Sequence, residues 1–210
     1  MLSRRLLPLS VVLLLMAPTG GWATHPSPAP LPQQFTLAET IHVPGISHAA
    51  KLNESLYRGT QPTEEGVKQL KKLGIDTIVD LRGERYSTSE KERKQAESLG
   101  MRFVKIPGNG WSPPRDEQIA QFFSLVRKRP RRTIFVHCWL GSDRTGVFLA
   151  TYRIAFDGWT PAQVLQEMRF FHFKSFWHPA MRAYIREFPA RLAHSPALAS
   201  FRQAGLTKSK

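Results

Sequence analysis

A buried strand that runs directly into a polar loop and then into a buried helix is the feature that most constrains the fold of this sequence. The stretch Ile134-Phe135-Val136 is β-branched and aromatic, as expected of a strand inside a sheet. Residues 137–144 follow as a loop, and residues 145–156 are apolar nearly all round, which is typical of a helix covered on every side. This segment is therefore predicted to lie at the centre of an α/β domain.

Strand and helix signals alternate along the chain on both sides of this central segment. The spacing of Ser89 to Glu92 and of Thr160 to Gln163 is that of a capping box, which predicts a helix beginning at each place. Alternating strands and helices favour a mainly parallel sheet flanked by helices. We expect a single α/β domain, with strands over residues 56–58, 75–81, 103–106 and 134–136 and helices between them.

The two ends of the chain have a different composition from the middle. Residues 1–23 contain two arginines, an apolar run and small residues before position 24, which predicts a secretory signal cleaved near Ala23 and export to the periplasm. The apolar run is shorter than the ~20 residues that span a bilayer, so stable membrane insertion is not expected. Prolines predict an extended linker over residues 24–44, followed by one domain over 45–195 and a flexible tail over 196–210.

Charge and cysteine content narrow the partners. The formal net charge is +14, which attracts nucleic acid, anionic lipid and polyphosphorylated small molecules alike. No recognised nucleic-acid motif is present, so a nucleic-acid partner is not expected. Cys138 is the single cysteine, so no intramolecular disulfide can form. His172 and His178 lack further ligands at zinc-binding spacing, and we expect no metal and no cofactor. The sequence does not indicate an oligomeric state.

Cys138 and Arg144 enclose five residues in a pattern that suits phosphate chemistry. The backbone N–H groups of such a loop can surround an anion, and the following helix adds its positive N-terminus. Gly141 lets the chain turn tightly, and the planar guanidinium of Arg144 can bind two phosphate oxygens. The residues predicted to bind the substrate phosphate are Trp139, Leu140, Gly141, Ser142, Asp143 and Arg144.

The same positive surroundings favour the thiolate form of Cys138, the form that attacks phosphorus. Attack gives a phosphocysteine intermediate. Thr145 follows the arginine and is placed to donate a hydroxyl hydrogen bond to the sulfur. His137 is predicted either to support the loop from below through backbone contacts or to be an ordinary buried histidine with its hydrogen bonds satisfied.

With these residues the sequence resembles the cysteine-dependent protein tyrosine and dual-specificity phosphatases, whose signature is His-Cys-x5-Arg-[Ser/Thr]. It is most similar to the compact bacterial members exported to the periplasm. The resemblance covers roughly residues 50–170, including Leu56-Tyr57-Arg58-Gly59-Thr60-Gln61-Pro62, Asp80-Leu81-Arg82 and Gly158-Trp159. It implies a phosphomonoesterase that needs no metal and has a parallel sheet flanked by helices.

The resemblance also implies a general acid, an aspartate on a loop before the cysteine that protonates the leaving group. Residues 109–111 contain no aspartate, and Asp116 is the nearest carboxylate, so we predict Asp116 in this role. Asp116 equally suits the first turn of the next helix, where the helix dipole stabilises a carboxylate. Glu117 is a weaker substitute. Asp143 is expected to face solvent or to bind a neighbouring basic residue.

Three functions remain open from the sequence. The first is a protein tyrosine or dual-specificity phosphatase acting on a phosphorylated protein. The second keeps the chemistry but takes a polyphosphorylated small molecule, such as an inositol polyphosphate, or a phospholipid head group. The third is a pseudophosphatase that binds phosphate without turnover, which the missing upstream aspartate would suit.

Overall fold

In the part of the chain that the structure describes, six strands form one sheet in the order β1-β2-β3-β6-β4-β5. The computed structural model describes residues 35–83, 86–128 and 130–205, and these belong to one unit that begins at Phe35. Strands β3, β6, β4 and β5 are parallel, whereas β1 and β2 add to the β3 edge in antiparallel fashion. The strands are β1 (Glu39–Thr40), β2 (Ala50–Asn53), β3 (Leu56–Gly59), β4 (Thr77–Arg82), β5 (Arg102–Gly108) and β6 (Ile134–His137).

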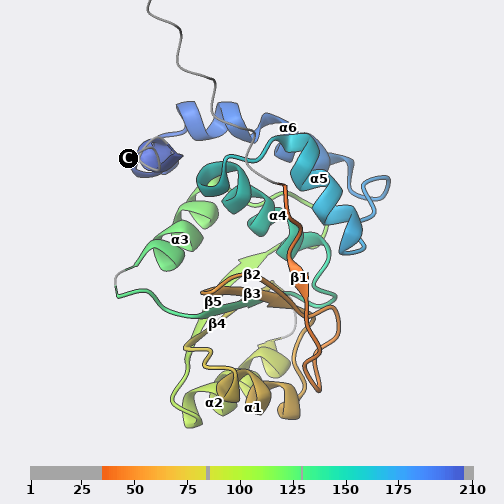
Figure 1. Ribbon diagram of the computed structural model, residues 1–210, viewed down its shortest axis with the longest axis vertical. Coiled ribbons are helices and arrows are strands. Elements are labelled where there is room, and N and C mark those ends of the chain that lie inside the picture. The colour runs from red at the N-terminus through yellow and green to blue at the C-terminus, as the bar shows by residue number, and fades with distance from the viewer. Residues whose placement is uncertain (1–34, 84–85, 129, 206–210) are drawn as a thin grey trace, which may run out of the picture. The chain divides into compact units, whose positions relative to one another are not determined.

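Helices cover both faces of the sheet, as Figure 1 shows, with α1 and α2 on one face and α3 to α6 on the other. This confirms the predicted α/β class with a mainly parallel sheet. None of the helices in the described residues is long and apolar enough to cross a membrane. The helices are α1 (Glu64–Lys72), α2 (Tyr86–Ser98), α3 (Asp116–Arg127), α4 (Asp143–Tyr152), α5 (Pro161–Phe170) and α6 (Pro179–His194), with a π-helical turn at Arg153–Asp157 and a 3-10 helix at Pro196–Gly205.

Successive side chains of a strand point to opposite faces of the sheet. Because helices cover both faces, the side chains of the central strands are buried on both. In β6, Phe135 packs into the core under α1 and α2, whereas Ile134 and Val136 pack into the larger core under α3 to α6. In β4, Ile78 and Val79 divide between the two cores in the same way. Burial of each such side chain contributes about 1.5–3 kcal/mol, so a polar substitution in either strand is costly.

The register of the parallel strands brings three strand ends together. His137, the last residue of β6, lies opposite Gly59 of β3 and opposite Asp80 of β4. In open α/β sheets this carboxyl edge is where ligands bind. The loop that follows β6 therefore begins between the ends of its two neighbours.

Both predicted domain boundaries need correction. Residues 24–44 were predicted as linker, but the chain packs from Phe35 onward: its ring contacts Trp159 at 4.6 Å between centroids, and the N–H of Ala38 donates to Glu167 over 2.9 Å. The tail predicted over residues 196–210 forms a 3-10 helix from Pro196 to Gly205, in which Leu198 is fully buried. The signal segment 1–23, the rest of the linker and residues 206–210 lie outside the described residues.

Two capping predictions had different outcomes. Thr160 accepts a hydrogen bond from the N–H of Gln163, so the capping box predicted at the start of α5 is confirmed. The capping box predicted at Ser89 and Glu92 is wrong, because α2 already begins at Tyr86 and both residues lie within it. Their side chains are buried and point to the sheet, where Ser89 binds Asp80 and Glu92 binds Arg82.

Candidate active site

The loop between β6 and α4 contains Cys138 to Ser142, as predicted, and Gly141 forms its turn. Gly141 has φ +72°, and a Cβ atom there would overlap the carbonyl group of Gly59 at the end of β3. Any side chain at this position would therefore be strained and would also collide with the neighbouring strand. The prediction of a tight turn at Gly141 is confirmed.

Arg58 of β3 holds this turn from the side. Its guanidinium donates a 2.5 Å hydrogen bond to the carbonyl oxygen of Gly141 and lies 3.9 Å from the ring centroid of Phe171. Burial lowers the pKa of Arg58 to about 10, and the nearby charges of Glu167 and Cys138 act in the opposite direction. A buried arginine is costly unless it is paired. The hydrogen bond to the Gly141 carbonyl oxygen offsets part of the cost of burying Arg58 beside the loop.

A chain of buried charged groups lies beneath the loop. Arg82 binds Asp80 at 2.7 Å and Glu92 at 2.6 Å, and the hydroxyl of Ser89 donates to Asp80 over 2.5 Å. Asp80 and Arg82 belong to β4, whereas Ser89 and Glu92 come from α2. The pKa of Asp80 is lowered: burial acts to raise it, but the hydrogen bond from Arg82 and the other positive neighbours outweigh burial.

His137 joins this chain to the loop. Its Nε2 lies 2.9 Å from Glu92 Oε1, and its Nδ1 lies 3.0 Å from the carbonyl oxygen of Cys138. Burial acts to lower the pKa of His137, but the attraction of Glu92 and then of Asp80 outweighs it, so the pKa is raised. A protonated imidazole forms an ion pair with Glu92 through Nε2 and can donate from Nδ1 to the Cys138 carbonyl oxygen. His137 therefore supports the loop from below through a backbone contact, as predicted.

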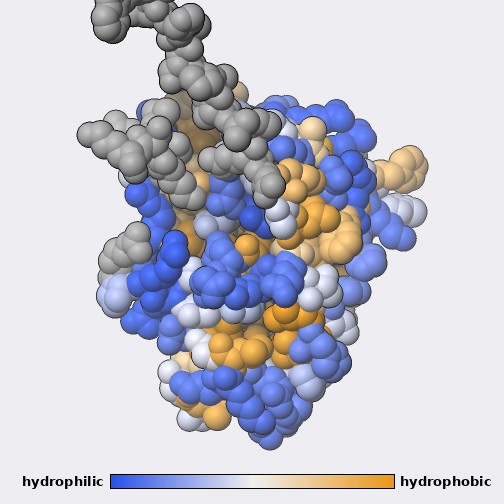
Figure 2. Space-filling model, in the orientation of Figure 1, coloured by the Kyte–Doolittle hydropathy of each residue, from blue (hydrophilic) through white to orange (hydrophobic). Residues whose placement is uncertain are grey.

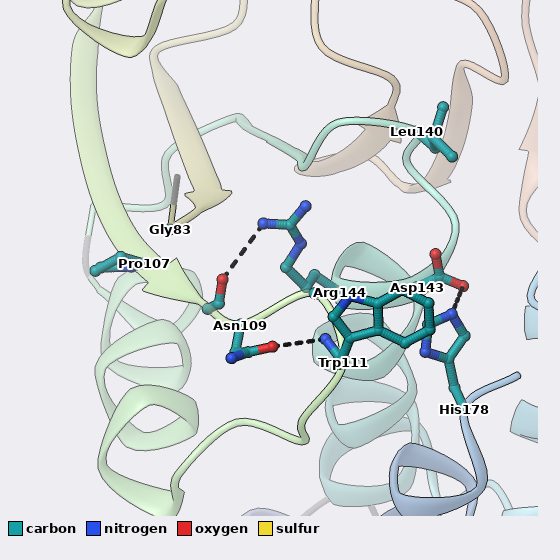
Figure 3. A pocket seen from close by; sticks show the side chains of 10 residues that line it. Gly83, Pro107, Asn109, Trp111, Leu140, Asp143, Arg144 and His178 are labelled. Carbon is teal, nitrogen blue, oxygen red and sulfur yellow. Dashed lines mark hydrogen bonds and ion pairs between the residues drawn. The ribbon is translucent and has the colours of Figure 1, made fainter. Parts of the chain in front are cut away.

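A pocket of about 870 Å³ opens beside the loop. Its walls come from Gly83, the stretch 107–111, the segment that contains Leu140, Asp143 and Arg144, and His178 at the start of α6. Figure 3 shows the Arg144 side chain extending into the open centre of this pocket. One of its terminal nitrogens donates to the carbonyl oxygen of Gly108 over 3.3 Å. The structure therefore presents this guanidinium to the space that an anion would enter.

Asp143 and His178 face each other across one wall of the pocket (Figure 3). His178 Nε2 lies 3.6 Å from Asp143 Oδ1, and the hydroxyl of Ser142 donates to Asp143 Oδ2 over 3.1 Å. The indole of Trp111 lies against the imidazole, with 5.2 Å between ring centroids. Asp143 thus binds a neighbouring basic residue, which confirms one of the two orientations predicted for it.

Cys138 and Thr145 flank the loop and are both buried. Cys138 is 3% exposed and Thr145 is fully buried. Thr145 Oγ1 has no hydrogen-bond partner among the described residues. A buried hydroxyl without a hydrogen-bond partner is costly. The Thr145 hydroxyl is therefore available to donate to an acceptor that is present only when a ligand is bound or when the Cys138 sulfur is charged.

Asp116 is not brought to the pocket. It is the first residue of α3, and its Oδ1 accepts a 3.1 Å hydrogen bond from the hydroxyl of Tyr184 and lies 3.5 Å from a terminal nitrogen of Arg191. Both partners belong to α6, on the side of α3 that packs against the helical layer. The structure thus supports the first-turn interpretation of Asp116 and places it outside the residues that line the pocket, which argues against its predicted role as the general acid.

The residues that sequence reasoning missed lie far from the loop along the chain. Arg58 and Asp80-Leu81-Arg82 carried the family resemblance without an assigned role, and Glu92 was explained by a local capping signal. His178 was considered only as a metal ligand. A buried charge on a predicted strand was the available signal for Arg58 and Arg82, because such charges are rare unless they are paired. Among the described residues no cluster of three or more His, Cys, Asp or Glu could hold a metal ion.

The fold and the loop are those of the cysteine-dependent phosphatases. The chain belongs to the family described as a DSP-PTPase phosphatase fused to NAD+ kinase, which matches residues 32–178. It is 26% identical over 161 residues to the dual specificity protein phosphatase TpbA of Pseudomonas aeruginosa strain UCBPP-PA14, a match that covers 75% of this chain and 70% of TpbA.

Solved structures show the same fold. A crystal structure of P. aeruginosa TpbA in complex with phosphotyrosine superposes with a TM-score of 0.61 at 21% identity, covering 81% of this chain and 96% of that one. The core catalytic domain of the PP-IP phosphatase Siw14 from Saccharomyces cerevisiae gives a TM-score of 0.60 at 16% identity, covering 74% and 98%. At these identities the likeness concerns the fold.

Proposed function

We propose that this phosphatase hydrolyses aryl phosphate monoesters, phosphotyrosine in a protein above all, with Cys138 as the nucleophile. The observation that supports this proposal best is the position of Arg144 at the centre of a pocket whose loop begins with Cys138. The aromatic and apolar side chains of Trp111 and Leu140 line the same pocket, which suits a phenyl ring. TpbA, the relative described above, has been crystallised with phosphotyrosine.

In the first step the thiolate of Cys138 attacks phosphorus, so that an S–P bond forms while the bond from phosphorus to the leaving oxygen breaks. Arg144 binds two of the phosphate oxygens as charge moves onto them. In the second step water attacks phosphorus, the S–P bond breaks, and inorganic phosphate leaves with the thiolate restored. Thr145 donates its unpaired hydroxyl to the sulfur when the sulfur carries negative charge, which supplies the missing acceptor.

The proton for the leaving oxygen comes, in this proposal, from Asp143 rather than from Asp116. Asp143 is the one carboxylate among the described residues that line the pocket. In its acid form it gives its proton to the leaving oxygen in the first step, and its carboxylate takes a proton from the attacking water in the second. His178 is a positioning residue, because it holds the carboxylate against the pocket wall.

A polyphosphorylated small molecule is the second candidate substrate. The pocket volume of about 870 Å³ exceeds what a phenyl phosphate needs, and the chain has a net charge of +14. The Siw14 catalytic domain, described as a PP-IP phosphatase, shares the fold. The predicted export to the periplasm is part of the proposal as well, and its support is the composition of residues 1–23.

Phosphate release by the purified protein tests the proposal. The substrates are p-nitrophenyl phosphate, a phosphotyrosine peptide, a phosphoserine peptide and inositol hexakisphosphate, each with a chelator present. We expect the phosphotyrosine peptide to give the highest kcat/KM and Cys138→Ser to abolish release from every substrate. Release that survives Cys138→Ser would rule out the mechanism, and phosphotyrosine binding without any turnover would indicate a pseudophosphatase.

The proton donor is tested by the leaving group. Asp143→Asn should lower kcat by about 10²-fold or more for an alkyl phosphate and by much less for p-nitrophenyl phosphate, whose leaving group needs no proton. Asp116→Asn is the matched control, since it changes the same group outside the pocket, and should affect both substrates equally. The opposite pattern for the two variants would return the role to Asp116.

A further inference from the structure

A second cavity adjoins the candidate active site. It has a volume of about 280 Å³ and shares Trp111, Leu140, Asp143 and His178 with the larger pocket. Beyond these shared residues its walls are formed by His48, Ser142, His172, Lys174 and Trp177. In Figure 3 the shared side chains of Trp111, Asp143 and His178 lie together at one side of the larger pocket. The second cavity therefore lies beside the space that a substrate seated at Arg144 would occupy.

Apart from Ser142, the side chains that belong to the second cavity alone are basic or aromatic. Lys174 is exposed and forms no ion pair within the described part of the chain, and His48 and His172 are exposed as well. Asp143 is the one carboxylate among the described lining residues, and it already faces His178. This balance of charge suits an anion, and the aromatic walls strengthen its attraction by displacing water.

The backbone gives independent support. His48 and His172 are the only two non-glycine residues with positive φ in the described chain, at 52° and 67°. They lie in separate turns, one before β2 and one after α5, yet their rings meet with 4.4 Å between centroids. A side chain other than glycine in this region of φ is strained, and strained residues persist where the surrounding structure fixes them, often at binding sites. Two such residues meeting in one small cavity indicate that the cavity has a use.

We propose that this second cavity is a subsite for a second phosphate group of the substrate, next to the phosphate that is removed. Lys174 supplies a fixed cation, and the paired imidazoles of His48 and His172 supply N–H donors to the same oxygens. Trp177 lines the same cavity. The subsite rests on the proposed function, because it takes the part of the substrate that lies beside the scissile bond.

Figure 1 shows that the segment joining α5 and α6, which includes Lys174 and Trp177, projects from the helical layer, and its tip is coloured as hydrophobic in Figure 2. Phe176 in this segment is 85% exposed and Trp177 is 63% exposed. An apolar tip beside a basic cavity leaves one competing occupant, an apolar residue of the substrate. The charge on Lys174 and the N–H donors of the two imidazoles favour the phosphate.

The test compares kcat/KM for matched pairs of substrates. One pair is a phosphotyrosine peptide and the same peptide with a phosphothreonine two positions away; the other is an inositol monophosphate and the corresponding bisphosphate. We expect the wild-type protein to prefer the doubly phosphorylated member of at least one pair by about tenfold. The pair that shows the preference identifies the source of the second phosphate.

Lys174→Ala and His172→Asn should each remove most of this preference. Asparagine tolerates positive φ, so His172→Asn removes the imidazole without adding strain. Lys72→Ala, which removes an exposed lysine of α1 on the other face of the sheet, is the matched control and should leave the preference intact. The subsite would be overturned if the wild-type protein had equal kcat/KM for the two members of each pair, or if Lys174→Ala left the preference unchanged. The proposed phosphatase mechanism would stand in either case.

Two further arms keep the outcomes separate. The first arm uses a peptide with leucine at the second position. If the wild-type protein prefers this peptide to its phosphorylated counterpart and Trp177→Ala abolishes the preference, the subsite is apolar and the proposal is overturned. If the wild type turns over no substrate, the proposed function fails. The subsite is then measured by calorimetry on Cys138→Ser, in which the singly and doubly phosphorylated peptides should differ about tenfold in Kd.

Discussion

The guanidinium of Arg58 donates to the carbonyl oxygen of Gly141 over 2.5 Å, which joins the end of β3 to the turn of the phosphate loop. The two residues are 83 positions apart in sequence. The turn therefore depends on a partner outside its own strand–loop–helix unit. Arg58 also contributes positive charge close to Cys138.

Arg58→Met is expected to lower both stability and activity. The substitution keeps an apolar stem but leaves the Gly141 carbonyl without its buried donor, which costs about 1–3 kcal/mol in free energy of unfolding. Urea denaturation and kcat for p-nitrophenyl phosphate measure the two effects. Arg202→Met is the matched control, because exposed Arg202 also donates to backbone carbonyls, those of Leu192 and Ser195, away from the loop. Equal effects of the two variants on kcat would contradict a role for Arg58 in the loop.

Gly141→Ala is expected to reduce kcat by about 10²-fold or more, because the added Cβ would overlap the Gly59 carbonyl and shift the loop. Gly74→Ala serves as control: Gly74 also has positive φ, at +77°, but a Cβ there meets nothing within 4 Å. It should cost about 1 kcal/mol of stability through backbone strain alone and leave kcat unchanged. The comparison separates strain from collision, and a fully active Gly141→Ala would show that the loop tolerates the shift.

The raised pKa of His137 predicts how stability changes with pH. Because the folded state binds the His137 proton more tightly than the unfolded state does, this contribution is fully present below the ordinary pKa of 6.5 and is lost as pH rises through the raised value. The free energy of unfolding should therefore fall as the pH rises from about 6.5 through the raised pKa of His137. Glu92→Gln removes the main group that raises this pKa and should flatten the fall. Parallel urea-denaturation profiles for the two proteins over this range would refute the assignment.

Leu198→Ala is expected to destabilise the protein by about 2–5 kcal/mol, since Leu198 is fully buried and its truncation leaves a cavity. Leu73→Ala is the control for the same change at a side chain that is 46% exposed, and should cost less than about 1 kcal/mol. Thermal or urea unfolding of both variants measures the difference. Equal stabilities would mean that the 3-10 helix does not form part of the core in solution.

The sequence could predict the features that depend on nearby residues. The strand, loop and helix around Cys138, the turn at Gly141 and the cap at Thr160 follow from residues a few positions apart, and the structure confirms them. The role of Glu92 could not be predicted in this way, since its spacing to Ser89 satisfied a local rule while its partners, Arg82 and His137, lie on two strands.

The prediction for Asp116 failed for a related reason. Asp116 was chosen because it is the carboxylate nearest in sequence to the position expected for the acid. Whether a helix residue faces a pocket or a neighbouring helix depends instead on packing. Tyr184 and Arg191 of α6 decide this for Asp116, and they lie about seventy positions later. Composition likewise predicted a flexible tail, although Leu198 and Phe201 were apolar residues at a spacing that allows burial on one side.

The buried chain from Asp80 through Glu92 to His137 makes the floor of the phosphate loop depend on α2. Each of its members needs the others to offset the cost of desolvation, so α2 must dock on the sheet before the floor of the loop is complete. Local opening of α2 would separate these charges and release the loop while the large core under α3 to α6 remained closed. The support beneath the phosphate loop therefore depends on the contact between α2 and the sheet, and not on the core under α3 to α6.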